Sequence, residues 1–206
     1  MEDVQIITGS EITPSYIKQA LELDRISYGE DYYLDFDKCL SYYQKNNEIY
    51  IMAVDSVKQK VLGYINFSPV TEKMFRLIKT GSVIDTVISD EDIVRYIEGN
   101  NCWAYMSSIV VHPNYRHKGL ARRMLGKLEN FIFSLASERS IYFYGIIADA
   151  VSAGGQKLLS NIGFKAVKRS EHDTVIMEMN FDEAPETQYN REILKIYAGG
   201  RKHSGV

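Results

Sequence analysis

Residues 107–125, SSIVVHPNYRHKGLARRML, carry the strongest structural signal in the chain. The segment begins as an apolar strand that runs to Val111, and Pro113 ends it because proline has no N–H to donate to a sheet. A short turn follows, and apolar side chains then recur at helical spacing along residues 119–137: Leu120, Met124, Leu128, Phe131 and Leu135. The segment therefore predicts a strand, a tight turn and an amphipathic helix in immediate succession.

The turn between strand and helix has the composition of an anion site. At a helix start about four backbone N–H groups lack partners, and the helix dipole adds partial positive charge. Gly119 lets a ligand approach the backbone, and Arg116, Lys118 and Arg122 surround it with charge. The turn therefore predicts a pyrophosphate site, although a plain turn glycine with surface bases is the alternative. The absence of GxGxxG, and of Lys-Ser/Thr after the glycine, excludes the Rossmann and P-loop motifs.

This unit resembles the signature of the GNAT N-acetyltransferase superfamily. The apolar-x-V-x-P pattern corresponds to residues 109–113, and Q/R-x-x-G-x-G/A corresponds to residues 116–121. The family's later Gly-Phe pair is matched by Gly163 and Phe164. The resemblance implies that acetyl-CoA binds along this unit as cosubstrate. The residues that it implies as cofactor-binding are Ile109, Val110, Val111, Arg116, His117, Lys118, Gly119, Leu120, Ala121, Arg122 and Ser152.

The resemblance also implies a fold. We expect an α/β protein of the GNAT acyl-CoA N-acyltransferase type, with a mixed, mostly antiparallel sheet, flanking helices and a helical insertion before the cofactor strand. One domain would cover residues 1–181, followed by a helix and tail over residues 182–206. The pattern of apolar residues predicts strands at 4–8, 48–54, 61–67, 103–111, 141–148, 164–169 and 174–181. It predicts helices from Pro14, at 36–45, at 119–137, at 154–162 and at 188–197.

Residues 69–101 interrupt the alternation of strands. Met74, Leu77 and Ile78 have helical spacing, as do Ile93, Val94 and Ile97, so the segment predicts one or two short helices. A long excursion in a compact domain is commonly a functional lid, although it can also simply cover a sheet face. Its acidic residues would form one wall of an acceptor cleft and attract a cationic amine: Asp85, Asp90, Glu91 and Asp92. A second acidic run comprises Glu30, Asp31, Asp35 and Asp37.

The catalytic groups are less clear than the cofactor site. The resemblance implies direct attack of a neutral amine on the thioester, and an alkylammonium with a pKa near 10 needs a base to become neutral. Tyr105 and Ile147 stand where family members carry a glutamate, so Asp149 and Asp85 are the candidate bases. Where the family has a tyrosine acid and an asparagine, this chain has Leu159 and Ser152. Tyr144 is therefore a candidate proton donor, with Tyr142 or water as alternatives.

Composition bears on the classes of protein and site that remain open: nucleic-acid binders, membrane or secreted proteins, and metal or disulfide sites. The 206 residues are 45% hydrophobic and 25% charged with a net charge of −3, which does not suit a generic nucleic-acid binder. No apolar run is long enough to span a bilayer, and the N-terminus lacks a signal pattern, so we expect a cytoplasmic protein without membrane contact. The spacing of the four histidines predicts no metal, and Cys39 and Cys102 are expected to be free thiols.

Three functions remain at this stage. The first is an N-acetyltransferase that acts on a primary amine of a small molecule or peptide. The second is a catalytically weak acyl-CoA binding or sensor module, favoured by the residues at the family's tyrosine and asparagine positions. The third, a nucleic-acid binder that uses the basic run from Arg116 to Lys127, is weaker because the expected cofactor already accounts for those charges. A homodimer is one open alternative for the assembly.

Overall fold

The computed structural model describes residues 3–29, 34–83, 85–188 and 190–200. Within these residues one seven-stranded sheet has the order β1-β2-β3-β4-β5-β7-β6. Its strands are β1 (Val4–Thr8), β2 (Tyr50–Asp55), β3 (Lys60–Val70), β4 (Cys102–Val111), β5 (Phe143–Ala150), β6 (Lys165–Arg169) and β7 (Val175–Met179). All neighbouring strands are antiparallel except β4 and β5, which are parallel and joined through a helix. The expected mixed, mostly antiparallel α/β fold is confirmed.

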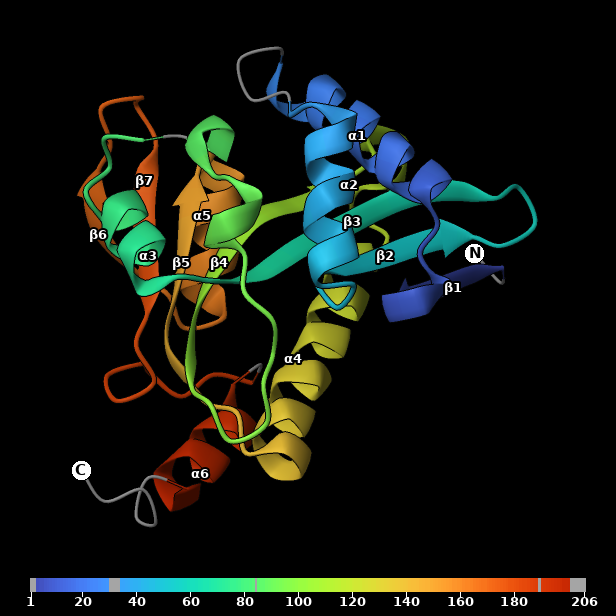
Figure 1. Cartoon of the computed structure of the whole chain (residues 1–206). Coiled ribbons are helices and arrows are strands. Elements are labelled where there is room, and N and C mark those ends of the chain that lie inside the picture. The colour runs from blue at the N-terminus through green and yellow to red at the C-terminus, as the bar shows by residue number, and fades with distance from the viewer. Residues whose placement is uncertain (1–2, 30–33, 84, 189, 201–206) are drawn as a thin grey trace.

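Helices cover both faces of the sheet (Figure 1). On one face lie α1 (Pro14–Tyr28), α2 (Phe36–Lys45) and α3 (Glu72–Lys79), whose apolar side chains share one core with that side of the sheet. On the other lie α4 (Leu120–Arg139), α5 (Ala153–Asn161) and α6 (Arg191–Gly200), which share a second core. The stripe that predicts α4 is its core side, because Leu120, Met124, Leu128 and Leu135 are all buried.

The C-terminal helix is part of this core rather than an appendage to it. Ile193 and Tyr197 of α6 are buried against α4 and the sheet. The Tyr197 ring stacks on Phe181, and its hydroxyl accepts a hydrogen bond from the Phe143 amide at 2.8 Å. The helix begins at Arg191, later than the expected residue 188, and residues 201–206 of the expected tail lie outside the described residues.

The described residues of the insertion contain one α-helix, the lower of the two numbers expected, and two short 3-10 turns. The first expected helix is α3, whose Thr71 cap accepts a hydrogen bond from the Met74 amide. The second candidate, at residues 93–97, does not form a helix, because Ile93 forms a β-bridge and residues 94–97 have no regular secondary structure. Strand β3 continues three residues past its expected end, and there the Val94 amide donates to the Pro69 carbonyl while Ile93 forms a bridge with Val70. Backbone pairing with the sheet thus outweighs the helical spacing of the side chains.

Candidate active site

Strands β4 and β5 separate halfway along β4. Their parallel ladder ends at the pair Met106 and Ala148, whereas β4 continues beside β3 as far as Val111. The register between β3 and β4 shifts at this same point, and Ser107 is the extra residue of the resulting bulge. The separation opens one edge of β4, from Ser107 to Val111, toward the second half of β5.

The open edge presents backbone groups that are not paired with a neighbouring strand. The His112 amide donates to the Leu62 carbonyl on β3, so alternation along the strand directs the amide of Val110 toward β3 as well. The amides and carbonyls of Ile109 and Val111 then face the opening. Side chains approach both carbonyls there, because the Tyr28 hydroxyl lies 3.5 Å from the Ile109 oxygen and Arg116 Nε donates to the Val111 oxygen at 3.2 Å. An extended ligand can therefore form backbone hydrogen bonds with Ile109 and Val111. Val110 also lines the cleft, although its amide faces β3.

The turn after β4 holds its backbone in a left-handed conformation at two residues. His117 has φ 61° and Gly119 has φ 79°, and Gly119 is the N-cap of α4 without any side chain to cap the helix. A Cβ at Gly119 would meet no atom within 4 Å, so the space before the first helical N–H groups is open. These N–H groups, the helix dipole and nearby Arg122 make the turn suitable for a pyrophosphate.

One cleft of about 760 Å³ joins the β4 edge, the turn and α5. This volume is within the range of small-molecule sites. Ten of the expected cofactor residues line it: Ile109, Val110, Val111, Arg116, His117, Gly119, Leu120, Ala121, Arg122 and Ser152. Lys118 is not among them, because its ammonium lies over the Tyr115 ring, 5.1 Å from the centroid. The neighbouring Arg123 donates to the Val4 carbonyl at 2.7 Å and faces away.

A smaller cavity of about 60 Å³ adjoins the cleft. The residues that line both are Tyr28, Ser107, Asp149 and Val151. Three carboxylates line the small cavity, one from each of three segments: Asp24 of α1, Asp85 of the insertion and Asp149 of β5. The two cavities therefore meet where β4 and β5 separate, and a carboxylate stands at the junction.

Asp149 follows directly after the last pair of the β4–β5 ladder. Its Oδ1 atom is buried and has no hydrogen-bond partner among the described residues. Burial raises the pKa of the Asp149 carboxyl, while a hydrogen bond from Thr174 and the charge of His172 oppose the rise. A half-buried carboxylate with a raised pKa and one unused oxygen has the properties of a general base.

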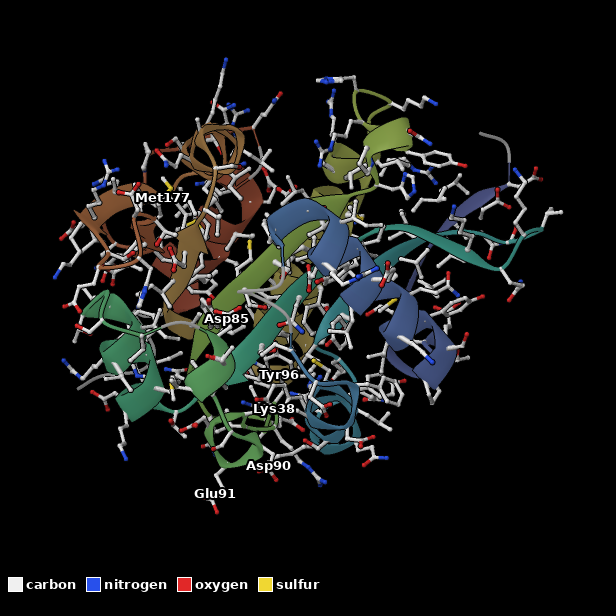
Figure 2. The ribbon with its side chains drawn as sticks, turned by 90° about the horizontal axis from the view of Figure 1, so that it is seen from above. Lys38, Asp85, Asp90, Glu91, Tyr96 and Met177 are labelled. Carbon is white, nitrogen blue, oxygen red and sulfur yellow. The ribbon has the colours of Figure 1, made fainter. Side chains whose placement is uncertain are left out.

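Asp85 lies farther from the cleft and accepts a hydrogen bond from the Tyr105 hydroxyl. Burial raises its pKa to about 6, and the charge of Asp149 adds to the rise. Lys38 of α2 acts in the opposite direction, with its ammonium bonded to the Thr86 carbonyl at 2.6 Å. Figure 2 shows Asp85 toward the middle of the molecule, whereas Glu91 projects from its rim. Of the four acids expected to line an acceptor wall, only Asp85 lines the cavity.

Asp24 is a site residue that the sequence did not suggest. Its side chain is 7% exposed, and one oxygen accepts a hydrogen bond from the Tyr64 hydroxyl. Burial raises its pKa to about 7, partly offset by that hydrogen bond, and the charge of Asp85 adds to the rise. Asp24 lies four residues after Ala20 and seven after Ile17 on the buried face of α1. A carboxylate on an apolar helix face is the signal that would have found it.

Comparisons with known proteins fit this geometry. A family model described as "Acetyltransferase (GNAT) family" matches residues 16–153. The chain belongs to this family. A curated relative, "GCN5-related N-acetyltransferase 4, chloroplastic" of Arabidopsis thaliana, is 34% identical over 71 residues, which are 34% of this chain and 23% of the relative. The chain thus matches about a quarter of that relative's length.

Solved structures of GNAT proteins share the fold. Ard1 from Thermoplasma volcanium has a TM-score of 0.58 at 11% identity, covering 86% of this chain and 97% of that one. The NatC complex bound to Gag peptide and CoA gives 0.59 at 13% identity, and PaiA N-acetyltransferase from Thermoplasma acidophilum in complex with coenzyme A gives 0.52 at 15%. Each of these two alignments covers 86% of this chain and 98% of the other. At such identities the likeness establishes the fold alone.

The structure of this GNAT chain places the remaining expected residues. Tyr144 is 50% exposed, lines neither cavity and packs on the Trp103 ring with centroids 5.1 Å apart. It is therefore not brought to the cavities that meet at Asp149. Leu159, at the family's tyrosine position, lines the cofactor cleft and is 5% exposed.

Ser152 caps α5 as well as lining the cleft. Its hydroxyl accepts a hydrogen bond from the Gly155 amide at 3.1 Å. Because losing an N-cap hydroxyl costs about 1 kcal/mol, we expect Ser152→Ala to lower the free energy of unfolding by that amount, as measured by urea denaturation without ligand. Ser152→Asn, which keeps a capping acceptor, should remain near the parent. A loss of CoA affinity with unchanged stability would show that the hydroxyl acts on the pantetheine arm instead.

The raised pKa of Asp24 predicts how stability changes with pH. Between the unfolded pKa near 3.9 and the folded pKa of about 7, the native state binds more protons, so its stability falls as pH rises. This group alone can account for up to about 4 kcal/mol across that window, and Asp85 acts in the same direction. We expect Asp24→Asn to reduce the loss of stability between about pH 5 and about pH 8 in urea titrations. Equal losses in variant and parent would contradict the assignment.

Three further features concern metal ligands, membrane-spanning helices and cysteines. Among the residues that the structure describes, no group of three or more His, Cys, Asp or Glu side chains is placed to hold a metal ion. No helix in the described ranges is both long and apolar enough to span a bilayer. Cys39 and Cys102 are free thiols, and burial raises the pKa of each to about 12.

Proposed function

We propose that this protein is an N-acetyltransferase that moves the acetyl group of acetyl-CoA directly to a primary amine of a small molecule or peptide. The observation that carries the proposal is the junction of two cavities at Asp149. The larger one has the edge, turn and helix start suited to a CoA, and the smaller one is lined by acids suited to an amine. The family assignment supports the same reaction.

The cofactor would lie with its pantetheine arm along the open edge and its pyrophosphate at the turn. The amides of Ile109 and Val111 face that edge and would pair with the arm's polar groups. The amides and the positive helix end near Gly119 would hold the phosphates, with Arg122 beside them. These positions bring the thioester end of the arm toward the point where β4 and β5 separate.

The transfer itself needs one proton acceptor from the protein. The neutral amine nitrogen attacks the thioester carbon, the C–N bond forms, the C–S bond breaks, and CoA leaves as a thiolate. Asp149 takes the proton that the amine loses, since its side chain lines both cavities, one of its oxygens has no hydrogen-bond partner among the described residues, and its raised pKa suits that role. An amide on the β4 edge would stabilise the developing oxyanion, and the thiolate takes its proton from water.

One observation favours a second function, an acyl-CoA binding or sensor module. Leu159 occupies the position of the family's acid, and a leucine side chain donates no proton. We still favour transfer, because a thiol pKa near 8.5 makes CoA a tolerable leaving group without an acid. The test is to incubate the protein with acetyl-CoA and a panel of amines while measuring free thiol and acetylated amine. Tight acetyl-CoA binding without product from any amine would favour the module.

A further inference from the structure

The small cavity contains more negative charge than the transfer of one amine requires. Asp149 alone stands at the junction with the cofactor cleft, whereas Asp24 and Asp85 line only the inner part. The charge of Asp149 acts on Asp85, and that of Asp85 acts on Asp24, so the three form a row that leads inward. None of them forms a salt bridge with a cation within the described ranges, although Lys38 lies near Asp85.

Asp24, at the inner end of this row, has one carboxylate oxygen that indicates a ligand site. Its side chain is more than nine-tenths buried, yet its Oδ1 atom has no hydrogen-bond partner among the described residues. A buried carboxylate with an unsatisfied oxygen is costly to the folded protein unless something in the cavity compensates it. Among the described residues, no side chain that lines the cavity carries a positive charge, so a cation bound in the cavity would compensate the carboxylate.

The shape of the cavity limits what that group can be attached to. Its volume of about 60 Å³ holds roughly four waters, and the Tyr28, Tyr42 and Tyr105 side chains are among its walls. An unbranched methylene chain is the narrowest common substituent of an amine and therefore suits such a small space. Buried tyrosine rings also suit an aliphatic ammonium through cation–π attraction.

We propose that the acceptor is a linear aliphatic diamine or polyamine, acetylated on one nitrogen beside Asp149 while its second ammonium binds at Asp24 and Asp85. This inference rests on the proposed acetyl transfer and specifies its substrate. The second ammonium supplies the positive charge that the inner carboxylates lack, and it fixes the distance of the reacting nitrogen from the cofactor cleft.

The test compares n-butylamine with diaminobutane, which differ only in the second nitrogen. We expect kcat/KM for acetylation of the diamine to exceed that of the monoamine by about 10- to 100-fold, the scale of a charge-assisted hydrogen bond. Asp24→Asn should remove most of this preference, and Asp85→Asn provides a second variant should the first fold poorly. Glu91→Gln, which removes an exposed acid outside the cavity, should retain it.

Two results would overturn the inference while leaving acetyl transfer intact: equal kcat/KM for the two amines, or a preference for a lysine-containing peptide over diaminobutane. Calorimetric titration of the CoA-loaded protein with each amine identifies the case in which the inner site binds a diamine but no acetyl group is transferred. If diaminobutane binds at least 10-fold more tightly than butylamine and neither is acetylated, the inner site stands and the proposed transfer fails.

Discussion

Replacing Gly119 with aspartate should lower the affinity for acetyl-CoA by about two to three orders of magnitude while the protein stays folded. The new carboxylate would lie at the N-terminus of α4, where the pyrophosphate is expected, and two negative charges about 4 Å apart repel by about 4 kcal/mol at an effective dielectric constant near 20. A Cβ meets no atom within 4 Å at this position, so the fold loses only the cost of a left-handed non-glycine residue, about 1–2 kcal/mol. Calorimetric titration with acetyl-CoA measures the effect.

Gly119→Asn is the matched control, because asparagine has the same shape, tolerates the left-handed conformation and carries no charge. It should lose far less affinity than the aspartate variant. If both variants lose equal affinity, the loss comes from the size of the new side chain at the turn rather than from its charge. If the aspartate variant binds acetyl-CoA as the parent does, the pyrophosphate does not lie at this helix start.

Replacing Asp149 with asparagine should lower kcat by about 10²- to 10⁴-fold, the contribution typical of a general base. The dissociation constant of acetyl-CoA should change little, because the expected contacts of the cofactor are with the β4 edge and the turn. Stopped-flow detection of released thiol, together with calorimetry, separates these two effects.

Asp85→Asn serves as the comparison, since Asp85 lines only the inner cavity. It should raise KM for the amine more than it lowers kcat. If Asp85→Asn instead reduces kcat and Asp149→Asn does not, the base is Asp85, acting with Tyr105. If neither variant slows the reaction, water must take the proton, and the position of Asp149 at the junction has no catalytic meaning.

The sequence could suggest a cofactor site because the residues expected to form it are neighbours in the chain. A strand end, a left-handed glycine and a helix start within residues 107–125 form one local unit, and the structure places ten of the expected residues around one cleft. Most strand and helix bounds agree within two residues, because alternating and helical patterns of burial are local as well.

The acceptor side could not be predicted in the same way, since it depends on tertiary packing. Asp24, Asp85 and Asp149 are more than a hundred residues apart at the extremes and meet only when α1 and the insertion pack over β4 and β5. Tyr144 was expected at the site as a proton donor in place of the family's tyrosine, but it is half exposed and packs beside Trp103. The helical spacing of residues 93–97 was likewise overruled by pairing with the end of β3.

A single-turnover experiment tests the central claim of direct transfer most directly. Excess protein is mixed with acetyl-CoA labelled in the acetyl group and with diaminobutane, and the label is followed by rapid quench and intact-protein mass spectrometry. The account predicts that label passes from CoA to the amine without appearing on the protein, at a rate that Asp149→Asn reduces. Label bound covalently to the protein, or acetyl-CoA bound tightly with no transfer to any amine, would contradict it.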